Sequence, residues 1–301
     1  MVTIDGLVVV DKPSGMTSHD VVALLRKIYG QRKVGHAGTL DPDATGVLLV
    51  GLGAATRLLR YLQDTAKGYA GTVVFGATTE TLDAAGKVTG TFDMHTLGRD
   101  DVERAAQAFV GAIEQVPPMV SAIRVGGKRL HELARAGREV ERPTRQVRID
   151  TLAVTGFRTG SQPEADIEVE CSSGTYIRAL AADLGAALRG GAHLGTLRRT
   201  RVGSFTLAEA HSISDIERRS LDLVLTPLEA VRSLERAEVG DATARKVGHG
   251  NTFAAHDLLS PNAGAGPFAV TSGAQLLAVY ERRGTGVKPS VVLATSGQAD
   301  R

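Results

Sequence analysis

The sequence predicts an α+β protein with a mixed, mainly antiparallel sheet and a small, β-rich C-terminal domain. Short apolar runs with strand periodicity alternate with amphipathic stretches of helical spacing, in no regular βαβ order. Beyond about residue 227 the chain becomes rich in glycine, and short β-like runs replace the helical spacing. Because 301 residues are enough for one large and one small domain, we expect domains at 1–228 and 229–301.

The first half of the chain predicts a strand at 7–10 followed by a capped helix. Thr17 is a candidate N-cap with Asp20 three residues later, and Gly30 ends the helix. The further elements expected here are a buried segment at 47–50, a helix at 55–62, a strand at 69–75, turns over 78–86 and a helix at 100–110.

The second half predicts strands at 147–157 and 165–171 and a helix that begins near Thr175. Cys171 falls on the apolar side of the second of these strands, so we interpret it as a core residue. The C-terminal domain is expected to contain β-strands at 268–271, 275–280 and 287–293, and disorder at 296–301.

Residues 34–46 are the most distinctive segment of the chain. They combine three glycines, one proline, one histidine and two aspartates, so we expect neither regular helix nor regular strand there. Pro42 restricts Asp41, and the apolar run 47–50 follows directly behind. A carboxylate on such a stiff loop is able to present a reactive oxygen to a ligand. A tight turn with a hydrogen-bonding Asp side chain is the alternative interpretation.

Four segments of the chain resemble motifs of the TruB family of tRNA pseudouridine synthases, in the family's order and spacing. They are GHAGTLDPDATGVL at 35–48, VDKPSGMTS at 10–18, SSGTYIR at 172–178 and GAHLGTLRR at 191–199. The resemblance covers roughly residues 5 to 210. It implies a pseudouridine synthase catalytic domain at 1–228 and, with weaker local support at 242–251, a PUA-like RNA-binding domain at 229–301.

The resemblance also implies the reaction. The uridine at position 55 in the T-loop of tRNA is flipped out and isomerised to pseudouridine without a cofactor, and Asp41 is the nucleophile. Because burial would raise the pKa of that carboxyl, we expect a cationic neighbour, and Arg178 is the candidate to lower it. Tyr69 lies in a Lys-x-Tyr sequence and matches the family's active-site tyrosine. Its ring would stack on the base and its hydroxyl would join the proton transfer.

Further residues receive roles from the same resemblance. Tyr176 and Leu197 match residues that line the uracil pocket, and Lys12 and Pro13 match residues that support the catalytic loop. We expect His36 to occupy the space that the flipped nucleotide vacates or to contact that nucleotide, although a lone histidine is more often a structural residue.

The net charge of +2 is uninformative, but the distribution of charge is not. Eight cations lie between residues 124 and 148 against three acids, and Arg198 belongs to a second basic cluster. A solvated surface is the ordinary meaning of such runs, and a phosphate-binding stripe is the alternative. Because the family binds tRNA, we favour the stripe and expect Lys128, Arg129 and Arg198 to contact RNA, with 124–148 as a basic insertion.

Several classes of function are disfavoured. A single cysteine excludes an internal disulfide and a cysteine-based zinc site, and the eight histidines are too scattered to predict a metal site. The segment GLGAAT at 51–56 lacks the context of a dinucleotide fingerprint.

We expect a cytoplasmic monomer that binds the T-stem-loop of tRNA, with no membrane span and no nucleotide cofactor. A non-catalytic tRNA-binding folding chaperone is the alternative function.

Overall fold

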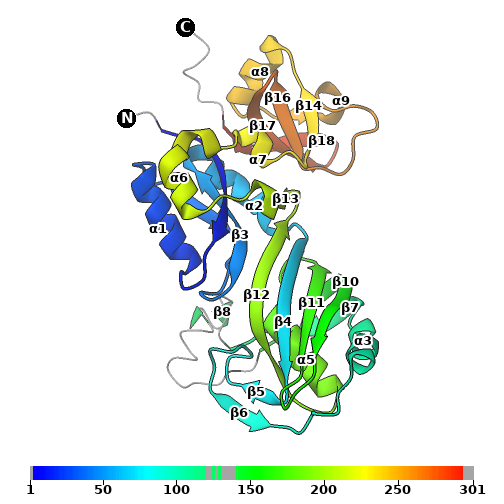
Figure 1. Ribbon diagram of the computed structural model, residues 1–301. Coiled ribbons are helices and arrows are strands. Elements are labelled where there is room, and N and C mark those ends of the chain that lie inside the picture. Colours follow the sequence, from blue (N-terminus) through cyan, green and yellow to red (C-terminus); the bar gives the residue numbers. More distant parts are fainter. Residues whose placement is uncertain (1–2, 120–123, 126–127, 130–139, 141, 294–301) are drawn as a thin grey trace.

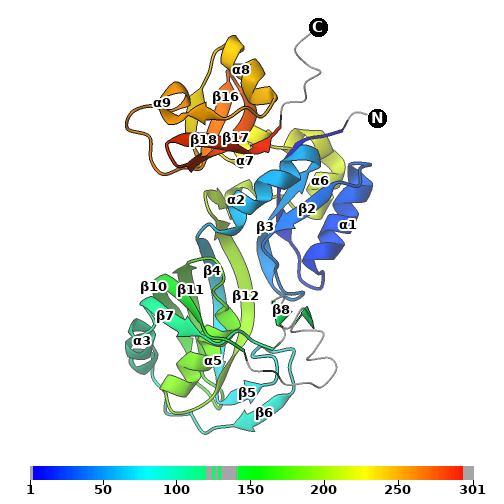
Figure 2. The same cartoon turned by 180° about the vertical axis from the view of Figure 1, so that it is seen from behind.

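The computed structural model describes residues 3–119, 124–125, 128–129, 140 and 142–293 (Figure 1). Within these residues a nine-stranded sheet carries the N-terminal part of the chain and a five-stranded sheet the C-terminal part. The second sheet lies at one end of an elongated molecule, next to α7 (Pro227–Ala230; Figures 1 and 2). The predicted α+β class with a β-rich C-terminal domain is therefore confirmed. The domain division at 228/229 stays a prediction.

The larger sheet has the order β1-β3-β12-β4-β11-β10-β7, with β2 paired to β3 and β13 to β12. Among the described pairings in this sheet, only that of β12 with β3 is parallel, so the expected mixed and mainly antiparallel sheet is confirmed. Its strands are β1 (Gly6–Lys12), β2 (Val34–Ala37), β3 (Thr45–Leu52), β4 (Lys67–Phe75), β7 (Gly111–Gln115), β10 (Arg145–Arg158), β11 (Glu164–Cys171), β12 (Ala192–Val202) and β13 (Phe205–Thr206).

Helices and two short hairpins surround this sheet. The capped helix is present as predicted: the Asp20 N–H donates to Thr17 Oγ1 over 3.1 Å at the start of α1. These elements are α1 (Ser18–Ile28), η1 (Gly53–Leu58), α2 (Leu59–Gln63), β5 (Ala77–Thr79), β6 (Val88–Thr91), α3 (Arg99–Gln107), β8 (Arg124–Val125), β9 (Lys128–Arg129), α5 (Ile177–Ala187), η2 (Leu207–Glu209), α6 (Ile213–Arg219), η3 (Ser220–Leu223) and α7 (Pro227–Ala230).

Strand β3 is buried on both faces, which explains its unbroken apolar run. Val47 and Leu49 pack into one core, whereas Leu48 and Val50 pack on the opposite side against residues of α1. Alternate residues of a strand point to opposite faces, so a strand covered on both faces needs apolar residues at every position. The strand that follows the Asp41 loop is therefore rigidly fixed.

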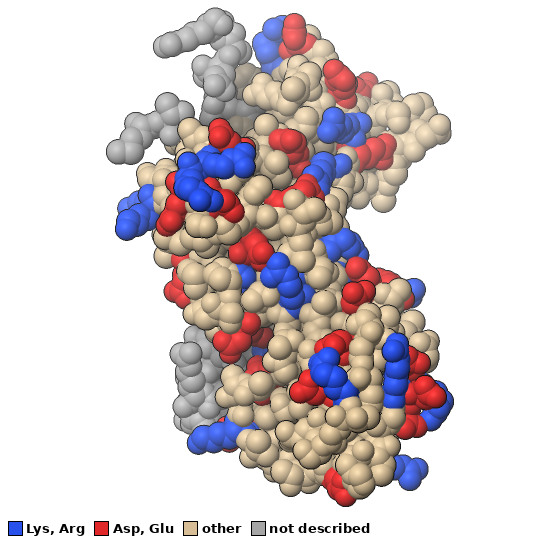
Figure 3. Space-filling view, viewed as in Figure 1, with Lys and Arg blue, Asp and Glu red and all other residues tan. Residues whose placement is uncertain are grey.

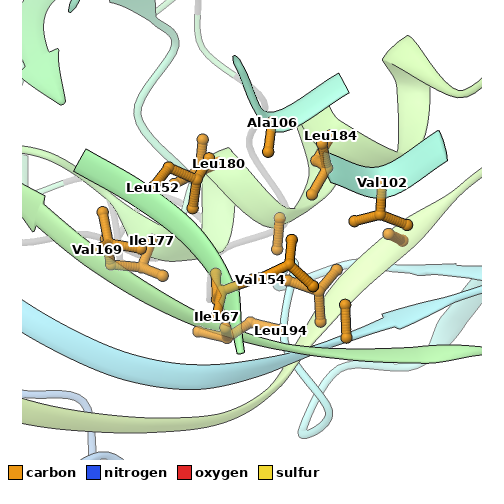
Figure 4. Close-up of a cluster of buried hydrophobic side chains, with 14 of the residues drawn as sticks. Val102, Ala106, Leu152, Val154, Ile167, Val169, Ile177, Leu180, Leu184 and Leu194 are labelled. Atoms are coloured by element: carbon orange, nitrogen blue, oxygen red, sulfur yellow. The ribbon is translucent and has the colours of Figure 1, made fainter. Parts of the chain in front are cut away.

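A third core lies between α3, α5 and the β4–β11–β10 half of the sheet (Figure 4). Leu180 and Leu184 of α5 and Val102 of α3 face Val154 and Ile167 of the sheet. Ile177 joins this core, and so does Cys171, which is fully buried as expected. This packing fixes the N-terminal end of α5, where Arg178 lies.

Three expectations about the N-terminal part of the chain are met only in part. The segment 34–46 is not wholly irregular, because 34–37 form β2 through pairing with β3. The helix expected over 55–62 begins as a 3₁₀ helix, and the turns expected over 78–86 include strand β5, which pairs with β6. In each case long-range pairing or packing outweighs the local pattern.

The smaller sheet has the order β14-β16-β17-β18-β15 and its own core around Phe268 and Tyr280. Residues 296–301, expected to be disordered, lie outside the described part of the chain. The elements of this end are β14 (Glu235–Glu238), α8 (Asp241–Gly248), β15 (Phe253–Ala254), α9 (Ala255–Leu258), β16 (Phe268–Ser272), β17 (Gln275–Arg283) and β18 (Gly286–Val292).

The two sheets share one apolar core. Leu276 and Val279 of β17 pack in the same buried cluster as Leu228 of α7, Leu58 of η1 and Val47 of β3. No helix among the described residues is both long and apolar enough to cross a bilayer.

Candidate active site

Asp41 lies on the loop that joins β2 to β3. Glycines with positive φ stand at both ends of this loop, Gly38 at +81° and Gly46 at +100°. A Cβ atom at Gly46 would lie 2.2 Å from the backbone oxygen of Arg199, so only glycine allows β3 to approach β12 here. The loop is thus confined at its two ends by backbone geometry.

Side chains from the N-terminal segment also hold this loop. The fully buried Lys12 ammonium donates to the backbone oxygens of Pro13, Met16 and Pro42 over 2.8, 2.6 and 2.9 Å. Ser18 Oγ accepts a hydrogen bond from Leu40 N–H over 2.9 Å. Lys12 therefore contacts the Asp41 loop directly, at the backbone oxygen of Pro42.

Arg178 binds the Asp41 carboxylate with two nitrogens. Its Nε lies 3.0 Å from Asp41 Oδ2, and its Nη2 donates to Oδ1 over 3.3 Å. The Arg178 side chain is only 5% exposed, while that of Asp41 is 43% exposed. A bidentate pair of this kind fixes the direction of both carboxylate oxygens. Asp41 is therefore aimed by a buried guanidinium while remaining open to a ligand.

A second carboxylate shares this guanidinium. Asp83, between β5 and β6, lies 3.4 Å from Arg178 Nη1 through its Oδ2. The same Nη1 donates to the backbone oxygen of Thr81 over 3.0 Å. Asp83 therefore helps to orient Arg178, and the two acids repel each other across it.

The pKa of Asp41 is raised above its ordinary value. Partial burial is the main cause and the charge of Asp83 adds to it, while the Arg178 guanidinium acts in the opposite direction. Burial and Arg178 therefore act in the expected directions, and the net shift is upward because the effect of burial is larger. The carboxylate is thereby made more basic than an exposed aspartate.

Tyr69 and Asp41 line the same small cavity. It has a volume of about 270 Å³, and Arg178, Tyr176, Leu197 and Arg199 complete its functional lining. Tyr69 is 9% exposed and burial raises the pKa of its phenol, an effect that Arg199 opposes. The cavity thus brings together an acid, an aromatic ring and two guanidinium groups.

A wider cleft of about 840 Å³ opens beside this cavity and shares Asp41, Arg178 and Leu197 with it. Arg198 lies on its wall, with its Nη2 2.7 Å from Asp11 Oδ2 and its side chain 41% exposed. On the face drawn in Figure 3, cations and acids are interspersed. A long ligand is able to lie along this cleft with one unit inserted into the cavity.

The comparisons with known proteins identify the fold and the family. Residues 26–177 match the N-terminal domain of TruB family pseudouridylate synthases, and 178–245 match the C-terminal domain of tRNA pseudouridylate synthase B. The chain belongs to the TruB family. It is accordingly a pseudouridine synthase, an isomerase, as the sequence predicts.

Two relatives of this TruB-family enzyme cover nearly all of it. The tRNA pseudouridine synthase B of Thermobifida fusca is 44% identical over 97% of this chain and 99% of its own length. That of Mycolicibacterium paratuberculosis is 45% identical over 96% and 97%. A solved chain from a Cbf5-Nop10-Gar1 complex is 25% identical, with a TM-score of 0.75, covering 97% of this chain and 85% of that chain. One from an H/ACA ribonucleoprotein bound to a substrate RNA containing 2′-deoxyuridine is 24% identical, with a TM-score of 0.74, covering 97% and 86%.

Some residues predicted for the site lie outside the cavity. His36 is on β2, where its ring meets His19 edge-on with 5.3 Å between centroids, and its buried Nδ1 has no hydrogen-bond partner in the described structure. Burial lowers the pKa of His36 to about 4, so the ring is neutral at physiological pH. Lys128 and Arg129 form β9, but their side chains lie outside the described part of the chain.

Gln115 is a residue that the sequence did not reveal. It is 1% exposed at the end of β7, and its side chain holds the backbone of Tyr176 directly before α5. Gln115 Oε1 accepts from Tyr176 N–H over 2.9 Å, and its Nε2 donates to Tyr176 O over 3.1 Å. Like Asp83, it acts across a long sequence separation, so no local pattern indicates it.

Metal binding finds no support among the described residues, where no group of three or more His, Cys, Asp or Glu side chains is placed to hold an ion.

Proposed function

We propose that this enzyme converts the uridine at position 55 in the T-loop of tRNA to pseudouridine, with Asp41 as the nucleophile and the target base flipped into the cavity beside Tyr69. The names of the two relatives that match nearly the whole chain support tRNA as the substrate. The bidentate contact of Arg178 with a partly exposed Asp41 carries the assignment of the nucleophile.

The isomerisation breaks the bond between N1 and C1′, forms a bond between C5 and C1′, releases the proton of C5, and leaves N1 to take up a proton. No electrons are gained or lost, so the reaction needs a nucleophile, a proton acceptor and a pocket for the detached base. Asp41 attacks as an anion at C1′ of the ribose or at C6 of the base, and both routes begin from the same charged oxygen. Arg178 orients that oxygen before the attack.

The cavity holds the base while its bond to the ribose is broken. Flipping a uridine out of a folded loop costs a few kcal/mol. Stacking on the ring of Tyr69 offsets about 1–3 kcal/mol of that cost. Leu197 and Tyr176 enclose the remaining sides, and the Tyr69 hydroxyl takes part in the proton transfer. His36, on β2, contacts the RNA at the position that the flipped nucleotide vacates.

The rest of the T-stem-loop follows the wider cleft. Arg198 on its wall and the basic insertion at 124–148 contact phosphates, and the domain at 229–301 is PUA-like and grips the acceptor end. Lys12 and Pro13 support the catalytic loop. The enzyme acts as a monomer in the cytoplasm.

Tritium release from C5-labelled uridine in a T-loop transcript tests this function. The native protein should release tritium, and a transcript with cytidine at position 55 should release none from that site. Asp41→Asn should be inactive, while Asp43→Asn, two residues away and exposed, should retain activity. Equal release by Asp41→Asn and the native protein would remove Asp41 as the nucleophile. If the native protein and its variants all bind the transcript but none releases tritium, the result would favour a folding role on tRNA.

A further inference from the structure

Arg199 is the largest side chain that is fully buried, at 1% exposure, and no step described above uses it. Among the described residues, no Asp or Glu forms an ion pair with its guanidinium. Removing an unpaired charge from water is costly, and such a group persists in a protein only when hydrogen bonds compensate it. The acceptors that surround Arg199 therefore indicate what it does.

Three of those acceptors are backbone oxygens on either side of Asp41. Arg199 Nε donates to Val47 O over 2.7 Å, Nη2 donates to Gly38 O over 3.1 Å, and Nη1 donates to Thr39 O over 3.4 Å. Gly38 and Thr39 lead into Asp41, and Val47 lies on the strand that leaves the loop. One guanidinium thus joins both ends of the catalytic loop.

The guanidinium also lies next to the side chain of Tyr69 and interacts electrostatically with its hydroxyl. The sheet register makes this contact possible, because Arg199 stands opposite Tyr69 of β4 on one side and opposite Gly46 of β3 on the other. Arg199, Tyr69 and Asp41 also line the same cavity. A single residue of β12 therefore lies between the two elements that carry the proposed nucleophile and the proposed aromatic wall.

We propose that Arg199 is a positioning residue that fixes the Asp41 loop and the Tyr69 hydroxyl relative to each other. Arg178 aims the carboxylate from α5, whereas Arg199 sets the distance between the loop and the ring. A planar guanidinium with five N–H donors is able to bind three backbone oxygens in fixed directions and still face the Tyr69 hydroxyl, and a lysine ammonium is not. This inference rests on the proposed function, which gives Asp41 and Tyr69 their roles.

The test is steady-state kinetics on a T-stem-loop RNA with Arg199→Lys, which keeps the charge and loses the fork. Because small misplacements of reacting groups are costly, we expect kcat to fall about 10- to 100-fold. The KM for RNA should stay within about twofold of the native value, since the Arg199 side chain is 1% exposed and its three nitrogens donate to backbone oxygens of the protein. Arg201→Lys is the matched control: it lies on the same strand, and its ion pair with Glu170 is outside the cavity.

A double-mutant cycle with Tyr69→Phe separates this role from general structural support. If Arg199 acts partly through the Tyr69 hydroxyl, Arg199→Lys will cost clearly less kcat in the Tyr69→Phe background than in the native one. Three outcomes would each overturn the inference. The first is that the two substitutions lower kcat by independent factors that multiply in the double mutant. The others are an unchanged kcat in a folded Arg199→Lys protein, and an effect of Arg199→Lys on KM alone.

Two further controls keep the result decisive. If circular dichroism finds Arg199→Lys unfolded, NMR of ¹⁵N-arginine-labelled enzyme replaces it: Tyr69→Phe should shift the slowly exchanging guanidinium signals of Arg199, and unshifted signals would overturn the inference. Asp41→Asn is measured beside these variants. Full activity of Asp41→Asn would reject the proposed function, whereas an inactive Asp41→Asn with a fully active Arg199→Lys would reject only the role of Arg199.

Discussion

The position of Asp41 and its ionisation depend on different neighbours. Arg178 orients the carboxylate oxygens through two contacts, but burial and Asp83 together raise the pKa against the influence of that guanidinium. A group whose pKa is raised on folding stabilises the fold below its ordinary pKa, and this contribution is lost as the pH rises through the folded-state value. At neutral pH the charge of Asp41 therefore opposes folding, as is common for groups selected for reactivity.

Asp41→Asn should abolish activity without weakening the fold. The neutral amide removes the cost of the buried charge, so we expect the Tm at pH 7 to be equal to or above that of the native protein. Because Asp41 is the proposed nucleophile, its removal should lower kcat by at least about 1000-fold. Thermal unfolding and tritium release measure the two effects. A Tm well below the native value would contradict the direction of the Asp41 pKa.

His36 gives a prediction with the opposite pH dependence. Its pKa is about 4 in the fold against an ordinary value of 6.5, so the unfolded chain binds the proton first as the pH falls. Its contribution to stability is therefore full above about 6.5 and decreases toward 4. His36→Phe keeps an aromatic ring in contact with His19 and removes the group that binds the proton.

We expect the Tm of His36→Phe to fall less than that of the native protein between pH 6.5 and 4. His256→Phe, at a site where the side chain is 85% exposed, serves as the control and should follow the native curve. Parallel curves for His36→Phe and the native protein would contradict the low pKa of His36.

At this scale the sequence was informative where a residue acts on its neighbours in the chain. Asp41 was singled out because Pro42 and the surrounding glycines mark a stiff loop, whereas its proposed role as nucleophile came from the resemblance to the TruB family. Asp83 and Gln115 were not found, because each acts on a residue about 60 to 95 positions away. Such contacts depend on the fold and leave no local signature.

Among the elements, β12 organises the site although it carries no strong strand pattern. It pairs antiparallel with β4, which bears Tyr69, and parallel with β3, which follows the Asp41 loop. The sequence motif at 191–199 was noted for its resemblance alone, and no strand was predicted there. Polar and charged residues at 196, 198, 199 and 201 obscure the alternation, because several of them serve the site.

The junction of β7 with α5 yields a prediction about Gln115. Gln115→Ala removes both hydrogen bonds to the backbone of Tyr176, and a lost buried partner costs about 1–3 kcal/mol. We expect a lower free energy of unfolding and a lower kcat, since the start of α5 carries Arg178. Urea denaturation and tritium release measure both. Gln107→Ala, exposed on α3, should change neither quantity, and a native-like Gln115→Ala would show that this contact does not position α5.

For the molecule as a whole, the shared core between the two sheets implies that they unfold together. Leu276, 4% exposed, packs with Leu228 and with residues of η1 and α2. Leu276→Ala should cost about 2–5 kcal/mol through the cavity that it leaves. We expect calorimetry to give one transition in the native protein, shifted to lower temperature by this change.

Leu221→Ala is the control, because Leu221 is 62% exposed and its loss should be nearly neutral. Two separate transitions, with only one of them moved by Leu276→Ala, would mean that the sheets are thermodynamically independent. The sequence predicted both sheets from their apolar periodicity. It did not predict their common core, because an amphipathic strand does not specify which other element covers it.

The most direct test of the catalytic arrangement is a crystal structure of the enzyme with a T-stem-loop RNA that carries 5-fluorouridine at position 55. We predict the nucleotide everted into the cavity, its base stacked on Tyr69, and an Asp41 oxygen within bonding distance or about 3–3.5 Å of C1′ or C6. A uridine that stays stacked within the loop, or an everted base whose ribose and C6 both lie far from Asp41, would contradict this account.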